Sequence, residues 1–207
     1  MTILQGLHLA IALYLKLFFL LTPFFVLSTF LTITAGVDTA LKQRLAIRIA
    51  LGTAGVTLII FFFGVRIMKI FGITVDAFRT GSGVLLLLVA VSLVYGTQNQ
   101  KMDFKKENLM DLAIVPLAVP ITAGPATLGT LMVMGLETPL VSGKIITVVS
   151  LVGAVASIGV MLFYSERIEK MLGRASISIL SKITGLILCA IAAQMIVIGV
   201  RQLWFAP

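Results

Sequence analysis

The stretch that decides the fold is residues 115–127, which read VPLAVPITAGPAT. Three prolines and one glycine fall between residues 116 and 125. Each proline lacks a backbone N–H, and its ring clashes with the preceding helical turn, so an undisturbed helix cannot run through this stretch. In a bilayer, the carbonyls freed by a break need partners from protein or water. The stretch therefore predicts a broken helix inside a bundle or beside a cavity, with a simple kink as the alternative.

The composition around this stretch is typical of a membrane protein. Of the 207 residues, 59% are apolar and 12% are charged, and the mean hydropathy is +1.15. These values exclude an ordinary globular enzyme, a disordered chain and a fibrous protein. The single cysteine (Cys189) and the single histidine (His8) exclude a disulfide framework and a His/Cys metal cage. Basic residues in cytoplasmic loops account for the net charge of +8, so we expect a lipid bilayer and no nucleic acid as the partner.

The charged residues divide the chain into six uncharged stretches, each long enough to cross a bilayer as a helix of about 17–25 residues. These stretches are residues 17–37, 49–65, 80–100, 112–136, 145–165 and 183–200. We therefore predict an all-α membrane protein with six transmembrane helices, of which helices 1 and 4 are broken at proline. Residues 3–15 begin the first helix or form an interfacial turn, and no charged residue is expected deep in a span.

The distribution of lysine and arginine predicts the orientation. Ten of these residues lie in the loops after helices 1, 3 and 5, and six lie on the other side. The loop after helix 5 is expected to hold Arg167, Lys170, Arg174 and Lys182. The positive-inside rule then places these three loops in the cytoplasm and both termini outside, in a multi-pass protein of the inner (plasma) membrane.

The two halves of the chain match each other at offsets of 101 to 103 residues. Pro23 falls on Pro125, Lys42 falls on Lys144, and Gly96 falls on Gly199. The chain is then one membrane domain, residues 1–207, with repeat 1 at about 1–100, a cytoplasmic loop at about 97–111 and repeat 2 at about 112–207. Because each half holds three helices, the halves must be inverted relative to one another. Chance similarity between hydrophobic segments is the alternative.

Two interrupted helices at matching positions indicate a binding site near the bilayer midplane. The candidate substrate-binding residues at the breaks are Thr22, Pro23, Thr122, Ala123, Gly124 and Pro125. The small residues Gly81, Gly83, Thr184 and Gly185 of helices 3 and 6 complete the predicted site, although helix packing alone also explains them. Gln194 should find a partner inside the bundle. No catalytic residue, metal site or cofactor is predicted, and Na⁺ or H⁺ remains open as a coupling ion.

Three segments resemble the MarC family of membrane proteins, also called the neutral amino acid transporter family. The segments are the 115–127 stretch, residues 71–96 (FGITVDAFRTGSGVLLLLVAVSLVYG) and residues 182–200 (KITGLILCAIAAQMIVIGV). The resemblance covers nearly the whole chain and implies movement of small neutral amino acids such as glycine, alanine or threonine. Members of that family usually carry Asn or Asp before the helix 1 proline. Thr22 stands there in this chain, so its substrate or ion preference can differ.

These observations predict a secondary transporter or exporter of small neutral amino acids, and not an enzyme. The alternative is a channel-like pore for an ion or small polar solute, because broken helices can also build a filter. A small partner subunit without its own activity, or a homo-oligomer, is also compatible with the sequence. An intramembrane enzyme would need a nucleophile with a base, or a metal set, and the sequence offers neither.

Overall fold

The computed structural model describes residues 3–95, 122–137 and 141–205, and this part of the chain forms α-helices and short connections without a strand. The helices are α1 (Ile3–Leu20), α2 (Pro23–Ile33), α3 (Thr39–Ile70), α4 (Val75–Tyr95), α5 (Pro125–Glu137), α6 (Val141–Phe163) and α7 (Ser165–Phe205). Five candidate membrane spans and the shorter apolar helix Ala126–Gly135 lie within it. The all-α membrane prediction is confirmed. The predicted loop 97–111 and residues 112–121 of the fourth span lie outside the described residues.

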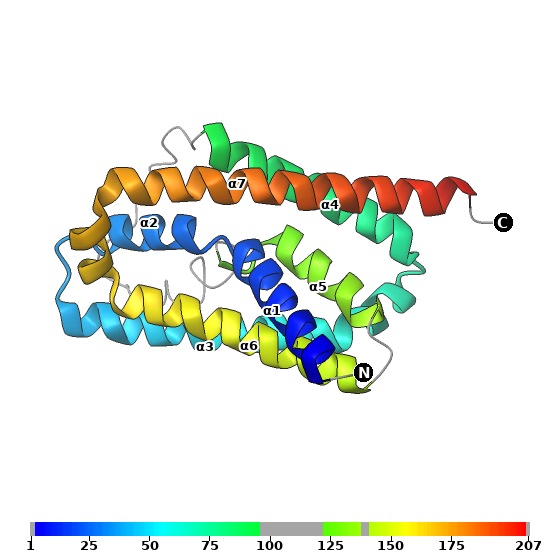
Figure 1. The fold of residues 1–207 in the computed structure, drawn as a ribbon, viewed down its shortest axis with the longest axis horizontal. Helices are drawn as coiled ribbons and strands as arrows, with labels where there is room; N and C mark the ends of the chain where they lie inside the picture. The colour runs from blue at the N-terminus through cyan, green and yellow to red at the C-terminus, as the bar shows by residue number, and fades with distance from the viewer. Residues whose placement is uncertain (1–2, 96–121, 138–140, 206–207) are drawn as a thin grey trace.

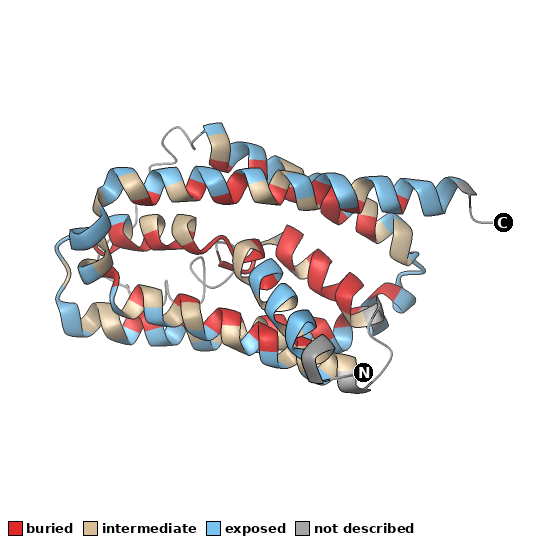
Figure 2. Cartoon of the chain, viewed as in Figure 1, coloured by how far each residue is buried: buried red, intermediate tan, exposed pale blue. Residues whose placement is uncertain are grey.

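The helices form three layers (Figure 1). One outer layer is the long pair α4 and α7, and the other is the pair α3 and α6. The short helices α2 and α5 lie between them, because α2 packs on α7 and α6 while α5 packs on α4 and α3. Figure 2 shows that these two short helices carry the densest burial. The half-helices that begin at the proline breaks therefore form the interior of the molecule.

Helix α1 crosses the bundle obliquely and packs on α6. The hydroxyls of Tyr14 and Ser157 form a hydrogen bond of 2.8 Å. The Ser150 hydroxyl donates to the backbone carbonyl of Ala10 at 3.1 Å. These two bonds join the start of the first half of the chain to the second half.

Glycines let α4 and α7 approach each other closely along their antiparallel crossing. A Cβ atom on Gly185 would lie 2.9 Å from the carbonyl oxygen of Ala90. A Cβ atom on Gly199 would lie 2.9 Å from the carbonyl oxygen of Asp76. Because backbone atoms cannot move aside as a flexible side chain can, only glycine fits at these two crossings.

The predicted break of the first helix is present, and in the described part of the fourth span a helix begins at Pro125. Helix α1 ends at Leu20 and α2 begins at Pro23, with Thr22 in the left-handed conformation (φ 48°, ψ 55°). Residues 122–124 precede α5, which begins at Pro125. Proline suits the first helical position because its missing N–H would have no partner there. The earlier prolines of the 115–127 stretch lie outside the described residues.

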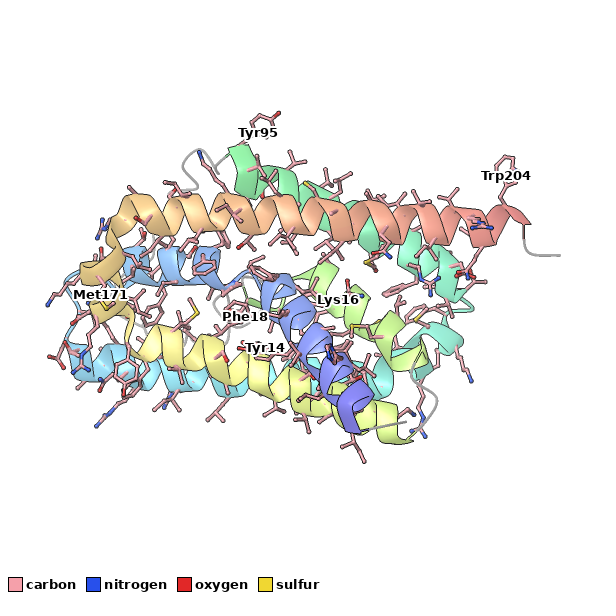
Figure 3. The ribbon with its side chains drawn as sticks, viewed as in Figure 1. Tyr14, Lys16, Phe18, Tyr95, Met171 and Trp204 are labelled. Atoms are coloured by element: carbon pink, nitrogen blue, oxygen red, sulfur yellow. The ribbon has the colours of Figure 1, made fainter. Side chains whose placement is uncertain are left out.

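The first span begins earlier than predicted. Its helical segment runs over Gly6–Ile33, not residues 17–37, so Lys16 lies inside it. This corrects the expectation that no charged residue falls deep in a span. Lys16 is exposed on α1 (Figure 3), and its long aliphatic stem can carry the ammonium toward the membrane surface.

The loop predicted after the fifth helix is instead helical. Tyr164 alone separates α6 from α7, and α7 continues through Arg167, Arg174 and Lys182. Lysine, arginine and glutamate are good helix formers, so the charged segment between the two apolar spans is itself mostly helical. A kink divides α7 at Gly173, whose φ of 74° only glycine adopts without strain.

The two ends of the described chain lie close to the same end of the bundle. The start of α1 and the end of α7 lie at the same end of the molecule, opposite the α2–α3 connection (Figure 1). This agrees with an even number of crossings, while the side of the membrane on which the termini lie stays a prediction.

Gln194 is exposed, so the expectation that it finds a partner inside the bundle is wrong. Its helix turns the opposite face toward α4, and helix periodicity places residue 194 outward.

Candidate functional site

The two half-helices begin near the middle of the molecule and run toward opposite ends (Figure 1). Helix α2 starts at Pro23 and α5 starts at Pro125. The N–H groups in the first turn of a helix have no intrahelical partner and carry partial positive charge. Two such helix starts therefore contribute donors and positive potential to one central region.

A hydrogen bond joins the two breaks directly. The Thr127 hydroxyl, in the first turn of α5, donates to the Leu20 carbonyl at the end of α1 at 3.2 Å. Both residues are buried. In an unbroken helix the Leu20 carbonyl would accept from the N–H four residues later, so the break frees it. The second half of the chain thus caps the interrupted helix of the first half.

The predicted residues at the breaks lie in the interior. Thr22 is 6% exposed and Thr122 is 1% exposed. Pro23 and Ala123 are buried, and Gly124 is partly buried. Pro125 begins α5. The Thr22 hydroxyl makes no capping bond to the first turn of α2.

The structure places the predicted residues of helices 3 and 6 in the contact between α4 and α7. Gly83 lies against Met195 and Ile196 of α7. Gly185 lies against α4, and the buried hydroxyl of Thr184 donates to the Leu180 carbonyl of its own helix at 2.9 Å. Gly81 is exposed, with nothing within 4 Å of a Cβ built on it. The structure does not bring Gly81 together with the breaks.

Residues of α5 that the sequence reasoning missed connect this interface to the central region. Gly129 packs against the buried Ser82 of α4. The Thr130 hydroxyl donates to the Ala126 carbonyl at 2.9 Å and lies 3.6 Å from the Met195 sulfur. The run of small and hydroxyl residues after Pro125 could have indicated this close packing. Thr127 is the last residue of the 115–127 stretch, but the sequence alone does not show that its hydroxyl bonds to Leu20.

Charged residues gather at one end of the bundle, by the α2–α3 connection. Lys42 of α3 and Glu166 of α7 form an ion pair of 2.7 Å, and the Thr39 hydroxyl donates to Glu166 at 3.2 Å. Glu166 precedes the bend at Gly173 and the apolar part of α7. The hydrogen bond and the charge of Lys42 lower the pKa of Glu166 below its ordinary value. This ion pair links the two halves of the chain.

At the opposite end, a buried arginine joins α4 to α7. Arg79 is 7% exposed. Its guanidinium forms an ion pair with Asp76 at 3.2 Å and donates to the side-chain oxygen of Gln202. These contacts hold the first turn of α4 against the last turns of α7.

In the part of the chain that the structure describes, no three His, Cys, Asp or Glu side chains are grouped as metal ligands would be.

The chain is similar to membrane proteins of archaea and bacteria. A family model described as MarC family integral membrane protein matches residues 7–204. A UPF0056 membrane protein of Methanocaldococcus jannaschii is 32% identical, over 95% of this chain and 98% of its own. The UPF0056 membrane protein YvbG of Bacillus subtilis is 26% identical, over 92% of this chain and 93% of its own. No solved structure matches the chain. The chain belongs to the MarC family of integral membrane proteins.

Proposed function

We propose that this chain is a secondary transporter or exporter of small neutral amino acids across the inner membrane. The single observation that carries the proposal is the hydrogen bond between the Thr127 hydroxyl and the Leu20 carbonyl. It brings the interrupted helices of both halves to one place in the interior, which is where secondary transporters with repeated halves bind substrate. The resemblance of the 115–127 stretch to the neutral amino acid transporter family supports the same class of substrate.

A zwitterionic amino acid suits the groups at this place. Its carboxylate can accept from the first-turn N–H groups that follow Pro23 and Pro125, where both helix dipoles are positive. Its ammonium can donate to carbonyls at the end of α1. The buried hydroxyls of Thr22 and Thr122 add neutral polar groups without a net charge. The substrate then brings both of its charges to backbone groups, and no charged side chain is required.

Uptake and counterflow assays in proteoliposomes test this proposal. The purified full chain is reconstituted and assayed with a panel of radiolabelled amino acids, with and without Na⁺ and pH gradients. We expect saturable counterflow for small neutral amino acids. Dependence on either gradient identifies the coupling ion.

A pair of matched variants tests the place of the site. Gly124→Leu adds bulk beside the first turn of α5 and should abolish counterflow while the protein stays in the membrane. Gly55→Leu adds the same bulk to an exposed face of α3, where nothing lies within 4 Å of the added Cβ, and should leave counterflow unchanged. Parental counterflow by well-expressed Gly124→Leu would place the site elsewhere. Unitary currents in planar bilayers would instead establish the channel-like alternative.

A further inference from the structure

The outward face of α7 carries a polar side chain in the middle of an apolar span. Gln194 is exposed. It lies twelve residues after Lys182 and seven before Arg201. At 1.5 Å per residue, these distances are about 18 Å and about 10 Å along the helix. The amide of Gln194 is therefore at the depth of the lipid hydrocarbon, where water cannot solvate it.

No other described helix presents an unpaired amide at this depth. The exposed residues in the middle of α3 and α6, such as Ile59 and Val149, are apolar or glycine. Ser92 of α4 is exposed, but its hydroxyl donates to the Val89 carbonyl of its own helix at 2.7 Å. Lys16 of α1 has a longer side chain that can reach toward the membrane surface. Within the described part of the chain, Gln194 has neither a hydrogen bond to its own helix nor a side chain as long as that of lysine.

The residues around Gln194 have the spacing of a helix–helix seam. Ile183, Ala190 and Val197 recur every seven residues and are exposed, with Ile187 partly exposed between them. Gln194 falls four residues after Ala190 and three before Val197, which is a core position of this seam. Figure 2 shows the exposed stripe along α7, on the side away from the buried middle layer. The small Ala190 beside Gln194 allows two helix backbones to approach.

We propose that a second copy of this chain packs its α7 against this seam, related by a two-fold axis along the membrane normal. The two copies insert in the same direction, so their α7 helices run parallel. A glutamine amide carries both a donor and an acceptor. Each Gln194 can therefore donate to the other across the axis, and the same patch serves both copies. A second copy is the occupant that matches the amide, because lipid chains supply no hydrogen-bond partner.

Cysteine crosslinking in native membranes tests the seam without relying on transport. In a Cys189→Ala background, Ala190→Cys and Val197→Cys should form covalent dimers on mild oxidation. Val149→Cys, on the outward face of α6, is the matched control and should remain monomeric. No covalent dimer at either α7 position, or an equal yield at Val149→Cys, would overturn the proposal.

The role of the amide is tested by measuring dimerisation of the full chain in lipid vesicles at decreasing ratios of protein to lipid. Energy transfer between labelled copies measures the association. Gln194→Leu should weaken dimerisation about three- to thirtyfold, which corresponds to the loss of an interhelical hydrogen bond. Gln194→Asn, which keeps a donor and an acceptor, should retain more of the association than Gln194→Leu. An unchanged association constant for Gln194→Leu would show that the amide does not hold the pair, and a monomer at every dilution would show that lipid alone covers this face.

Discussion

At the residue scale, two of the interior threonines, Thr22 and Thr127, shape the central region in different ways. Thr127 uses its hydroxyl to satisfy a carbonyl that the break in α1 exposes. Thr22 supplies the turn itself, in a left-handed conformation that is costly for a β-branched residue. Asn, one of the residues that the family resemblance leads us to expect at that position, tolerates the left-handed conformation better. The threonine of this chain therefore combines backbone strain with a shorter polar group.

Thr22→Gly should raise the free energy of unfolding by about 1 kcal/mol, because glycine adopts φ 48° without steric strain. Thr22→Val keeps the β-branched strain and loses only the hydroxyl. It should give no such gain and should weaken amino acid binding by about 0.5–1.5 kcal/mol. Thermal unfolding in detergent and binding isotherms measure the two effects. Equal stability of Thr22→Gly and Thr22→Val would show that strain at this turn has no energetic consequence.

Thr127→Val should lower the free energy of unfolding by about 1–3 kcal/mol, because the buried Leu20 carbonyl then lacks its donor. Thr127→Ser keeps the hydroxyl and should remain much closer to the parent. Unfolding of the purified variants in detergent micelles gives the comparison. If valine and serine are equally tolerated, another group satisfies the Leu20 carbonyl.

The Lys42–Glu166 ion pair makes stability depend on pH. Because the pKa of Glu166 is lowered in the folded chain, its contribution is fully present above the ordinary pKa of 4.5 and is lost as the pH falls through the lowered value. The acid limb is the fall in the thermal unfolding temperature as the pH decreases. Glu166→Gln should make this fall smaller. Glu169→Gln is the control, since Glu169 pairs with Arg174 of its own helix and joins no other helix. An acid limb that is the same in Glu166→Gln and the parent would contradict this role.

At the scale of elements, the small residues of α4 and α7 determine how closely the two helices pack. Gly185 and Gly199 face backbone oxygens of α4 at distances that a side chain would violate. Sequence reasoning identified Gly83 and Gly185 but could not decide between a substrate surface and helix packing. The structure shows the packing contact, because only the partner helix reveals which atoms a glycine faces.

Gly185→Ala should destabilise the protein by about 1–3 kcal/mol, because its methyl group would press on the Ala90 carbonyl oxygen. Gly55→Ala meets nothing within 4 Å and should be neutral or stabilise by up to about 1 kcal/mol. Thermal unfolding in one detergent compares the two variants directly. If the order is reversed, the helices do not approach as closely as described.

At the scale of the whole molecule, each short interior helix packs on one of the two long helices α4 and α7. Helix α2 packs on α7, and α5 packs on α4. Exchanging the halves would convert one contact into the other, while the pairs α4–α7 and α3–α6 would map onto themselves. The overlay of the two halves stays a prediction.

We expect residues 17–100 and 112–205 to superpose after a rotation of about half a turn around an axis in the membrane plane. The physical reason is that each half crosses the membrane an odd number of times. An experimental structure in a lipid environment that resolves residues 96–121 tests the superposition. Unrelated helix arrangements in the two halves would refute the repeat.

The sequence by itself determined the membrane class, most of the span positions, the break at Pro23 and the helix start at Pro125. These depend on local chemistry, namely runs of apolar residues long enough for a bilayer and the missing N–H of Pro23 and Pro125. The tertiary structure alone decided that Thr127 caps Leu20, that Gly81 stays outside while Gly83 and Gly185 join two helices, and that Gln194 faces outward. Each of these outcomes depends on a neighbour that is remote in the chain. Hydropathy and proline chemistry therefore define the segments, whereas the partner of each polar group is decided only when the segments pack.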